Sequence, residues 1–164
     1  MQGIVVFGNS GSGKSTFARQ QSANLACSVL DLDTVAWEPE LETPTRRPLA
    51  ASAADIQNFI SASQTWVVEG CYADLLALAT PHATEAVFLN PGTETCIENA
   101  RQRPWEPHKY SSPEAQDANL EMLVAWIREY EHRVDEFSYG AHRGLFDGFR
   151  GRKREFKSNT WRNP

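Results

Sequence analysis

The chain has 164 residues and a formal net charge of −5, and 41% of its residues are hydrophobic. This length fits one domain that buries about two-thirds of its unfolded surface. No run of 18 apolar residues occurs and no signal-peptide core precedes the first apolar run, so we expect a cytoplasmic protein without a transmembrane helix or a membrane partner.

The charge is unevenly distributed along the chain. Residues 1–142 hold 9 Lys/Arg against 19 Asp/Glu, a net charge of −10, whereas residues 143–164 hold 7 against 2, a net charge of +5. A nucleic-acid binder usually spreads positive charge over a face, so we do not expect nucleic acid as a partner. The basic tail either contacts phosphates or is a solvated terminus. The three cysteines lack metal-binding or CxxC spacing and are interpreted as free thiols.

Short apolar runs alternate with longer helical stretches, a pattern typical of a parallel sheet covered by helices. The five expected strands are 3–7, 28–32, 65–69, 86–89 and 154–157. The expected helices are 14–25, 54–63, 73–79 and 93–102, and a long helix after Ser112, whose apolar stripe runs from Leu120 to Phe137. Segment 34–54 contains three prolines and is expected to be irregular.

A glycine-rich octet follows the first strand and opens the first helix. Its sequence, Gly8-Asn9-Ser10-Gly11-Ser12-Gly13-Lys14-Ser15, matches the phosphate-binding P-loop pattern G-x-x-x-x-G-K-[ST]. The glycines let backbone N–H groups converge on an anion, towards which the helix also directs its positive end. We expect residues 8–15 together with Thr16 to bind ATP, Lys14 to contact the β- and γ-phosphates, and the Ser15 hydroxyl to bind Mg²⁺. The motif alone does not select a kinase, an ATPase or a GTPase.

Three acidic residues follow strands, at the sheet edge where ligands bind in parallel α/β proteins. Asp33 is the candidate to orient or deprotonate an acceptor hydroxyl, and Asp31 is a weaker candidate. Glu69 follows the apolar run Trp66-Val67-Val68, as a magnesium-holding acid does in P-loop proteins. Each of these acids could instead be a turn or helix-cap residue.

Phosphoryl transfer also needs positive charge over the moving group. Arg101 and Arg103 lie at the end of a helix, beside a polar loop, and are the candidate catalytic arginines of a lid over about 101–113. The alternative is that they stabilise the helix C-terminus. Arg46 and Arg47, in an acceptor-binding excursion over about 34–64, could meet an anionic acceptor, although surface solubility is the preferred role for that pair. The four histidines are interpreted as non-catalytic.

With these residues placed, the chain resembles the small-kinase branch of P-loop proteins, which includes adenylate, shikimate and gluconate kinases. Leu30-Asp31-Leu32-Asp33 is similar to the F-x-D-x-D stretch of shikimate kinases, and Val67-Val68-Glu69-Gly70 to the apolar-apolar-Asp-Gly of adenylate kinases. A closer resemblance is to bacterial DNA topology modulation proteins, or FlaR-like kinases, through two stretches: Leu32-Asp33-Thr34-Val35-Ala36-Trp37-Glu38-Pro39 and Trp66-Val67-Val68-Glu69-Gly70-Cys71-Tyr72.

This resemblance implies a single three-layer α/β domain over 1–164, with a five-stranded parallel sheet in the order 2-3-1-4-5. It implies a kinase that transfers the γ-phosphoryl group of Mg-ATP to a small-molecule acceptor, as a monomer or homodimer. The competing hypothesis is a nucleotide-dependent regulatory ATPase whose basic tail binds a partner such as nucleic acid. A GTP-binding protein is disfavoured because the sequence has no Asn-Lys-x-Asp motif.

Overall fold

Five parallel strands form the central sheet, in the order β2-β3-β1-β4-β5. The computed structural model describes residues 1–39 and 43–162. The strands span, in chain order, Gln2–Gly8 (β1), Ser28–Asp31 (β2), Thr65–Gly70 (β3), Glu85–Leu89 (β4) and Arg152–Phe156 (β5). Both the parallel pairing and the strand order confirm the expectation from sequence.

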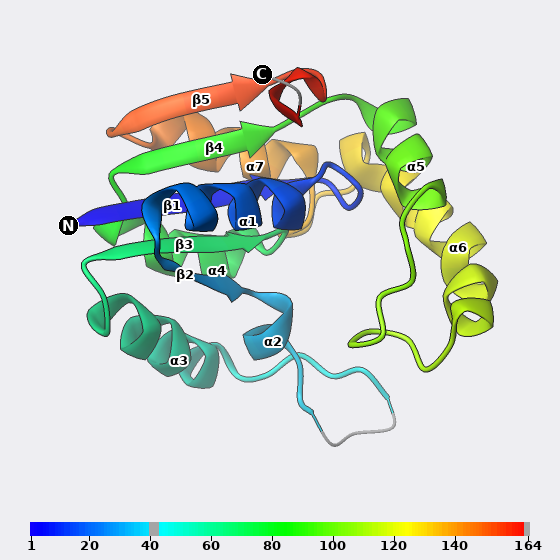
Figure 1. Cartoon of the computed structure of the whole chain (residues 1–164), viewed down its shortest axis with the longest axis horizontal. Helices are drawn as coiled ribbons and strands as arrows, with labels where there is room; N and C mark the ends of the chain where they lie inside the picture. Colours follow the sequence, from blue (N-terminus) through cyan, green and yellow to red (C-terminus); the bar gives the residue numbers. More distant parts are fainter. Residues whose placement is uncertain (40–42, 163–164) are drawn as a thin grey trace.

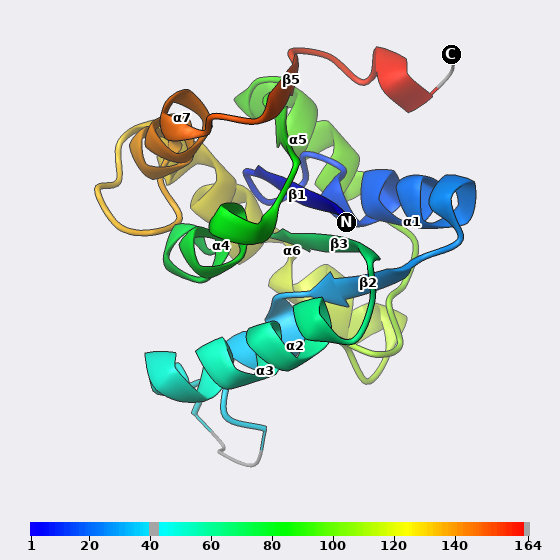
Figure 2. The same ribbon diagram turned by 90° about the vertical axis from the view of Figure 1, so that its left-hand side faces the viewer.

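Helices cover both faces of this sheet (Figures 1 and 2). They span Lys14–Leu25 (α1), Asp33–Ala36 (α2), Leu49–Ser61 (α3), Ala73–Ala79 (α4), Thr93–Arg101 (α5), Pro113–Arg128 (α6) and Tyr139–Gly148 (α7). Helix α1 lies on one face and α4 and α7 on the other, while α5 and α6 lie beyond the carboxyl ends of the strands. Among the described residues, no helix combines the length and the apolar character that a membrane span requires.

The alternation of side chains along β1 explains why the sheet is buried on both faces. Ile4 and Val6 belong to the apolar cluster under α1, whereas Val5 and Phe7 belong to the larger cluster under α3, α4 and α7. All four side chains are buried. A strand covered on both faces needs a continuous apolar run, and Ile4-Val5-Val6-Phe7 supplies one.

The excursion after β2 contains more helix than the sequence indicated. Its first residues form α2, and α3 begins at Leu49, five residues before the expected start of that helix. Pro48 occupies the N-cap position of α3, and the following residues, Leu49-Ala-Ala-Ser-Ala-Ala, are mostly good helix formers. The irregular segment therefore ends at Pro48 rather than at residue 54.

The long helix predicted after Ser112 was wrong at its C-terminal end. Ser112 does cap it, because its hydroxyl accepts a hydrogen bond from the Ala115 N–H at 3.1 Å. However, α6 ends at Arg128, and Val134 of the expected stripe is 99% exposed. A 3₁₀ turn over Glu129–Glu131 redirects the chain into α7, a helix that the sequence pattern did not predict.

The last strand is short of apolar residues because it lies at the edge of the sheet. β5 spans Arg152–Phe156, two residues earlier than expected at its start, and pairs with β4 alone. Arg154 makes an ion pair with the buried Glu85 of β4, which gives this charged strand an electrostatic partner across the pair.

Candidate functional site

The loop between β1 and α1 has the backbone geometry of a phosphate cradle. Gly11 and Gly13 adopt positive φ angles of 76° and 95°, which residues other than glycine rarely adopt. A Cβ atom at Gly11 would come within 2.3 Å of the Cys96 carbonyl oxygen. Because α1 begins at Lys14, the positive end of the helix is directed at the same loop.

Two amide side chains fasten this loop to the helices beside it. Asn9 Nδ2 donates to the Ile127 carbonyl of α6 at 3.1 Å, and Asn99 Nδ2 of α5 donates to the Gly11 carbonyl at 2.8 Å. The backbone N–H groups therefore keep their orientation without help from a ligand, which is the preorganisation that anion binding requires. Neither anchor could be derived from the motif.

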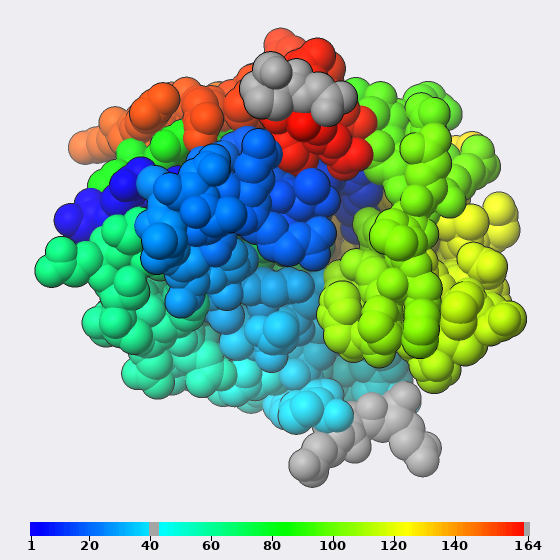
Figure 3. Space-filling view, in the orientation of Figure 1, coloured from blue at the N-terminus to red at the C-terminus, as the bar shows by residue number. Residues whose placement is uncertain are grey.

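The remaining residues of the expected nucleotide-binding set lie along the same loop and the first turn of α1. Gly8 and Ser12 are buried, Ser10 is half-buried and Thr16 is exposed. Lys14 Nζ donates to the Asn9 carbonyl at 2.8 Å, so its ammonium lies over the loop. The lid segment (residues 102–112, between α5 and α6) flanks the loop on the side opposite α1 (Figure 3).

Asp31, the last residue of β2, and Glu69, which lies within β3 rather than after it, meet next to the first turn of α1. The Ser15 hydroxyl donates to Glu69 Oε1 at 2.6 Å, and Asp31 is paired with Glu69 in the register of β2 and β3. Burial and the Asp31 carboxylate raise the pKa of Glu69 to about 7. Burial and Asp33 raise the pKa of Asp31, whose Oδ1 also accepts the Asp33 N–H at 2.9 Å. Such crowded carboxylates favour a cation between them.

The oxygen donors present fit Mg²⁺, which takes one or two protein ligands together with phosphates and water. Ser15 and Glu69 are the pair that would hold it. Among residues 1–39 and 43–162, no group of three or more His, Cys, Asp or Glu side chains could hold a metal ion.

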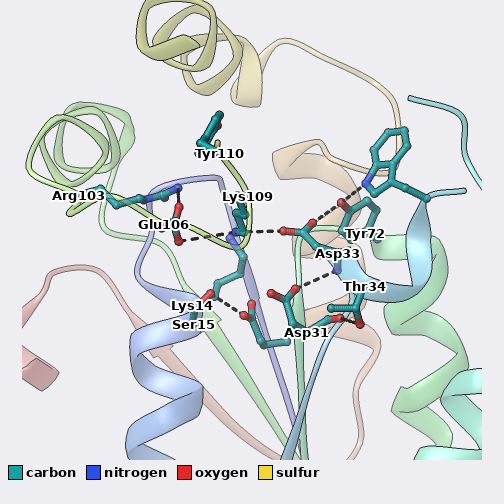
Figure 4. A network of polar contacts seen from close by, with 12 residues as sticks. Lys14, Ser15, Asp31, Asp33, Thr34, Tyr72, Arg103, Glu106, Lys109 and Tyr110 are labelled. Atoms are coloured by element: carbon teal, nitrogen blue, oxygen red, sulfur yellow. Dashed lines mark hydrogen bonds and ion pairs between the residues drawn. The ribbon is translucent and has the colours of Figure 1, made fainter. Parts of the chain in front are cut away.

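Asp33 lies across the site at the start of α2, held by two aromatic side chains (Figure 4). Tyr72 donates its hydroxyl hydrogen to Asp33 Oδ1, and Trp37 Nε1 donates to the Tyr72 oxygen at 2.8 Å. Burial opposes ionisation of Asp33, but the Tyr72 hydrogen bond and the Lys109 ammonium together lower its pKa. Asp33 is therefore a carboxylate in the neutral pH range, able to accept a hydrogen bond or a proton.

The lid brings a lysine, rather than the expected arginines, to Asp33. Lys109 Nζ lies 3.3 Å from Asp33 Oδ2. Arg103 Nη1 instead donates to Glu106 at 3.2 Å within the lid. Arg101 is exposed and lines a small hollow between α5 and α6 together with Leu120 and Leu123. Arg101 makes no ion pair within the described part of the chain. The role expected of Arg101 and Arg103, over the transferring phosphoryl group, stays a prediction. Lys109 was missed, although the lid loop in which it lies was identified.

Arg46 and Arg47 do not act as isolated surface cations. Arg46 makes ion pairs of 2.8 Å with both Asp74 and Glu136, and Arg47 pairs with Asp55 at 2.7 Å. The preference for a solubility role was therefore wrong, because partial burial and fixed acidic partners make this pair structural.

The basic tail is folded onto the sheet, and two of its seven cations make close ion pairs, whereas Arg150, Arg152, Lys153, Lys157 and Arg162 are exposed. Arg143 pairs with Glu155 at 2.6 Å, and Arg154 pairs with Glu85. Trp161 packs edge-on against Phe17 of α1, with ring centroids 5.2 Å apart. The tail thus forms the β5 edge and a 3₁₀ turn beside the phosphate loop rather than a loose terminus.

Comparisons with known proteins agree with this fold. No curated protein matches the chain. Among solved structures, the chain is similar to a sugar kinase from Janibacter sp. HTCC2649, with a TM-score of 0.51, 14% identity, and coverage of 100% of this chain and 87% of that one. It is also similar to the shikimate kinase of Acinetobacter baumannii (TM-score 0.42, 19% identity, 88% of each chain). A third similar structure is a gluconokinase from Sinorhizobium meliloti 1021 (TM-score 0.46, 20% identity, 88% and 93%).

A comparison with protein-family models also finds a match. The model of the AAA domain family matches residues 4–130, which include the phosphate loop, the three acids and the lid. Because this match covers most of the chain, the protein belongs to the AAA domain family of P-loop proteins.

Proposed function

We propose that this protein is a kinase that transfers the γ-phosphoryl group of Mg-ATP to a hydroxyl group of a small molecule. The observation that carries the proposal is the placement of Asp33. Its carboxylate faces the site that also contains Lys14 and Ser15 (Figure 4), and Ser15 is hydrogen-bonded to Glu69. The lowered pKa of Asp33 keeps it ionised. Phosphoryl transfer uses a residue that orients or deprotonates the attacking nucleophile, and Asp33 is placed to act in this way on an acceptor hydroxyl.

The residues divide into three roles. Residues 8–16 would hold the phosphates, and Lys14 would contact the β- and γ-phosphates. Ser15 and Glu69 would hold Mg²⁺, which when bound neutralises charge that develops on the phosphate oxygens. Asp33 orients the acceptor hydroxyl, and Tyr72 with Trp37 fixes the orientation of Asp33.

Asp33 accepts the acceptor's proton as the hydroxyl oxygen forms its bond to the γ-phosphorus. The bond between that phosphorus and the β–γ bridging oxygen breaks, and ADP leaves with the electron pair.

The test is ADP formation that depends on an acceptor. Purified protein with Mg-ATP is screened against neutral sugars, polyols, nucleosides, nucleotides and hydroxy acids, and products are checked by mass spectrometry for one added phosphoryl group. Asp33→Asn should lower kcat by about 10²–10⁴-fold, the usual range for loss of a general base. Asp55→Asn, which removes an acid on α3 paired with Arg47, is the matched control. A protein that binds Mg-ATP but phosphorylates no member of the panel would contradict the proposal.

A further inference from the structure

The lid segment reaches across the site through a single side chain, Lys109 (Figure 4). Its ammonium lies 3.3 Å from Asp33 Oδ2 and 3.9 Å from Glu106 Oε1, and its side chain is 28% exposed. The two residues of the main pair, Asp33 and Lys109, are separated by 76 positions along the chain. This ion pair therefore joins the lid directly to the acid that follows β2.

Hydrogen bonds within the lid and to α6 fix the backbone around Lys109. The N–H groups of Lys109 and Tyr110 both donate to the Glu106 carbonyl at 3.0 Å. The Glu106 N–H in turn donates to Gln116 Oε1 of α6 at 2.9 Å, and the Tyr110 hydroxyl accepts from Asn119 Nδ2 at 2.9 Å. The stem of Lys109 supplies the remaining freedom, because four flexible methylenes separate the charge from this frame.

Both carboxylate oxygens of Asp33 are engaged in this arrangement. Tyr72 occupies Oδ1 and Lys109 occupies Oδ2. Each oxygen can accept a second hydrogen bond, but the Lys109 ammonium opposes transfer of an acceptor's proton to Asp33, because it stabilises the charged carboxylate. Tyr72 is itself held by Trp37. Lys109 is the partner with a flexible stem, so its departure is the simplest way to make Asp33 available.

We propose that Lys109 is the lid cation that contacts the terminal phosphate of the bound nucleoside triphosphate. When the nucleotide binds, the Lys109 ammonium leaves Asp33 and pairs with that phosphate. This exchange frees Asp33 Oδ2 for the acceptor. The phosphate attracts the ammonium more strongly than one carboxylate does because it carries more charge. The part of this inference that frees Asp33 for an acceptor rests on the proposed kinase function. The exchange itself involves only the nucleotide and can be measured without an acceptor.

The first experiment compares the affinities of a non-hydrolysable ATP analogue and of ADP, each with Mg²⁺, by calorimetry. A charge-assisted contact contributes about 1.5–3 kcal/mol, so Lys109→Gln should weaken analogue binding roughly 10- to 100-fold and leave ADP binding within about twofold. Lys109→Arg should restore most of the difference. Lys153→Gln, on β5, is the control and should change neither affinity. The proposal would be overturned if Lys109→Gln left the ratio of analogue affinity to ADP affinity unchanged. It would also be overturned if Arg101→Gln, rather than Lys109→Gln, abolished the preference for the analogue.

The second experiment tests the exchange. Asp33→Asn removes the competing partner, so it should tighten binding of the analogue by several-fold without affecting ADP. A double-mutant cycle of Asp33→Asn and Lys109→Gln on unfolding free energy should show coupling in the free protein and none with the analogue bound. Coupling that persists in the bound protein would refute the exchange. If Lys109→Gln does not fold, Lys109→Met, which also removes the charge, replaces it in the cycle, and Asp33→Asn still decides the affinity arm. Because neither experiment uses an acceptor, their outcome is independent of whether the kinase panel succeeds.

Discussion

Gly13 combines two constraints at one position of the phosphate loop. Its φ angle is 95°, and a Cβ atom there would come within 2.7 Å of Arg162 Nη2 and 2.9 Å of the Trp161 ring. The first constraint comes from the backbone and belongs to every loop of this kind. The second comes from the tail, which packs against the loop only in the folded chain.

Gly13→Ala should lower the free energy of unfolding by about 1–3 kcal/mol, because alanine is strained at this φ and would displace the tail. It should also weaken Mg-ATP binding. Chemical denaturation and nucleotide titration measure the two effects. Gly144→Ala is the matched control, because Gly144 lies in α7 and nothing lies within 4 Å of its added Cβ atom. An equal loss in both variants would contradict the argument.

Glu69 should make the stability of the nucleotide-free protein depend on pH. Its pKa of about 7 lies above the ordinary value of 4.5, because burial and Asp31 disfavour the charged form. The folded state therefore binds a proton that the unfolded state releases, so the Glu69 contribution is complete below pH 4.5 and is lost as the pH rises through 7. Glu69→Gln should gain stability relative to the wild type between pH 5 and pH 8. Urea denaturation at both pH values measures this difference, and Glu121→Gln, an exposed residue of α6, should show none.

At the scale of elements, His142 explains how α7 is attached to the sheet. Its side chain is fully buried, with Nε2 2.8 Å from the Cys71 carbonyl and Nδ1 2.7 Å from the Tyr130 hydroxyl. The carbonyl can only accept, so Nε2 carries the proton and Nδ1 accepts from Tyr130. One imidazole thus links α7 to the 3₁₀ turn after α6 and to the end of β3.

His142→Ala should lower the free energy of unfolding by roughly 2–4 kcal/mol at pH 7, because it leaves a cavity and two buried polar groups without partners. Burial lowers the pKa of His142 to about 4. Its contribution is therefore present above pH 6.5 and is lost as the pH falls towards 4, so the difference between wild type and variant should shrink over that range. Denaturation at pH 7 and pH 5 tests both points. His132→Ala, at an exposed position, should show neither effect.

At the scale of the whole molecule, Arg46 holds three distant segments together. It joins the excursion after β2 to Asp74 of α4 and to Glu136, between α6 and α7, and its guanidinium lies 5.0 Å from the centre of the Tyr72 ring. Residue 46 also forms an antiparallel bridge with Trp37. Since Tyr72, which accepts a hydrogen bond from Trp37, donates to Asp33, Arg46 supports the proposed catalytic base from outside the site.

Arg46→Met should destabilise the protein by about 1–2 kcal/mol, a modest value because all three charged side chains are a quarter to a third exposed. It should also reduce acceptor-dependent activity while Mg-ATP affinity stays unchanged, because the phosphate loop is anchored separately by Asn9 and Asn99. Thermal unfolding, turnover and nucleotide titration measure these effects. Arg150→Met, at an exposed position, is the control. Loss of nucleotide affinity in Arg46→Met would show that the two halves of the site are not separable in this way.

Local signals in the sequence account for much of the fold. The apolar run of β1, the glycine loop and the cap at Ser112 each depend on residues that are neighbours in the chain, so each was predictable. The end of α6 and the existence of α7 were not. They depend on contacts of Tyr130 and His142 with residues far away in sequence, and those contacts overrode the apolar stripe that continued to Val134.

The sequence by itself determined the phosphate loop, the alternation of strands and helices, and the placing of acids at the carboxyl ends of β2 and β3. Each of these features depends on residues within a short stretch of chain. Only the tertiary structure decided which lid cation meets Asp33, how Tyr72 orients that acid, and where Arg46 is engaged. Each of these contacts joins residues separated by 28 to 90 positions. Such pairings depend on how the sheet orders its strands and where the helices cross its edge, and no local pattern in the chain encodes them.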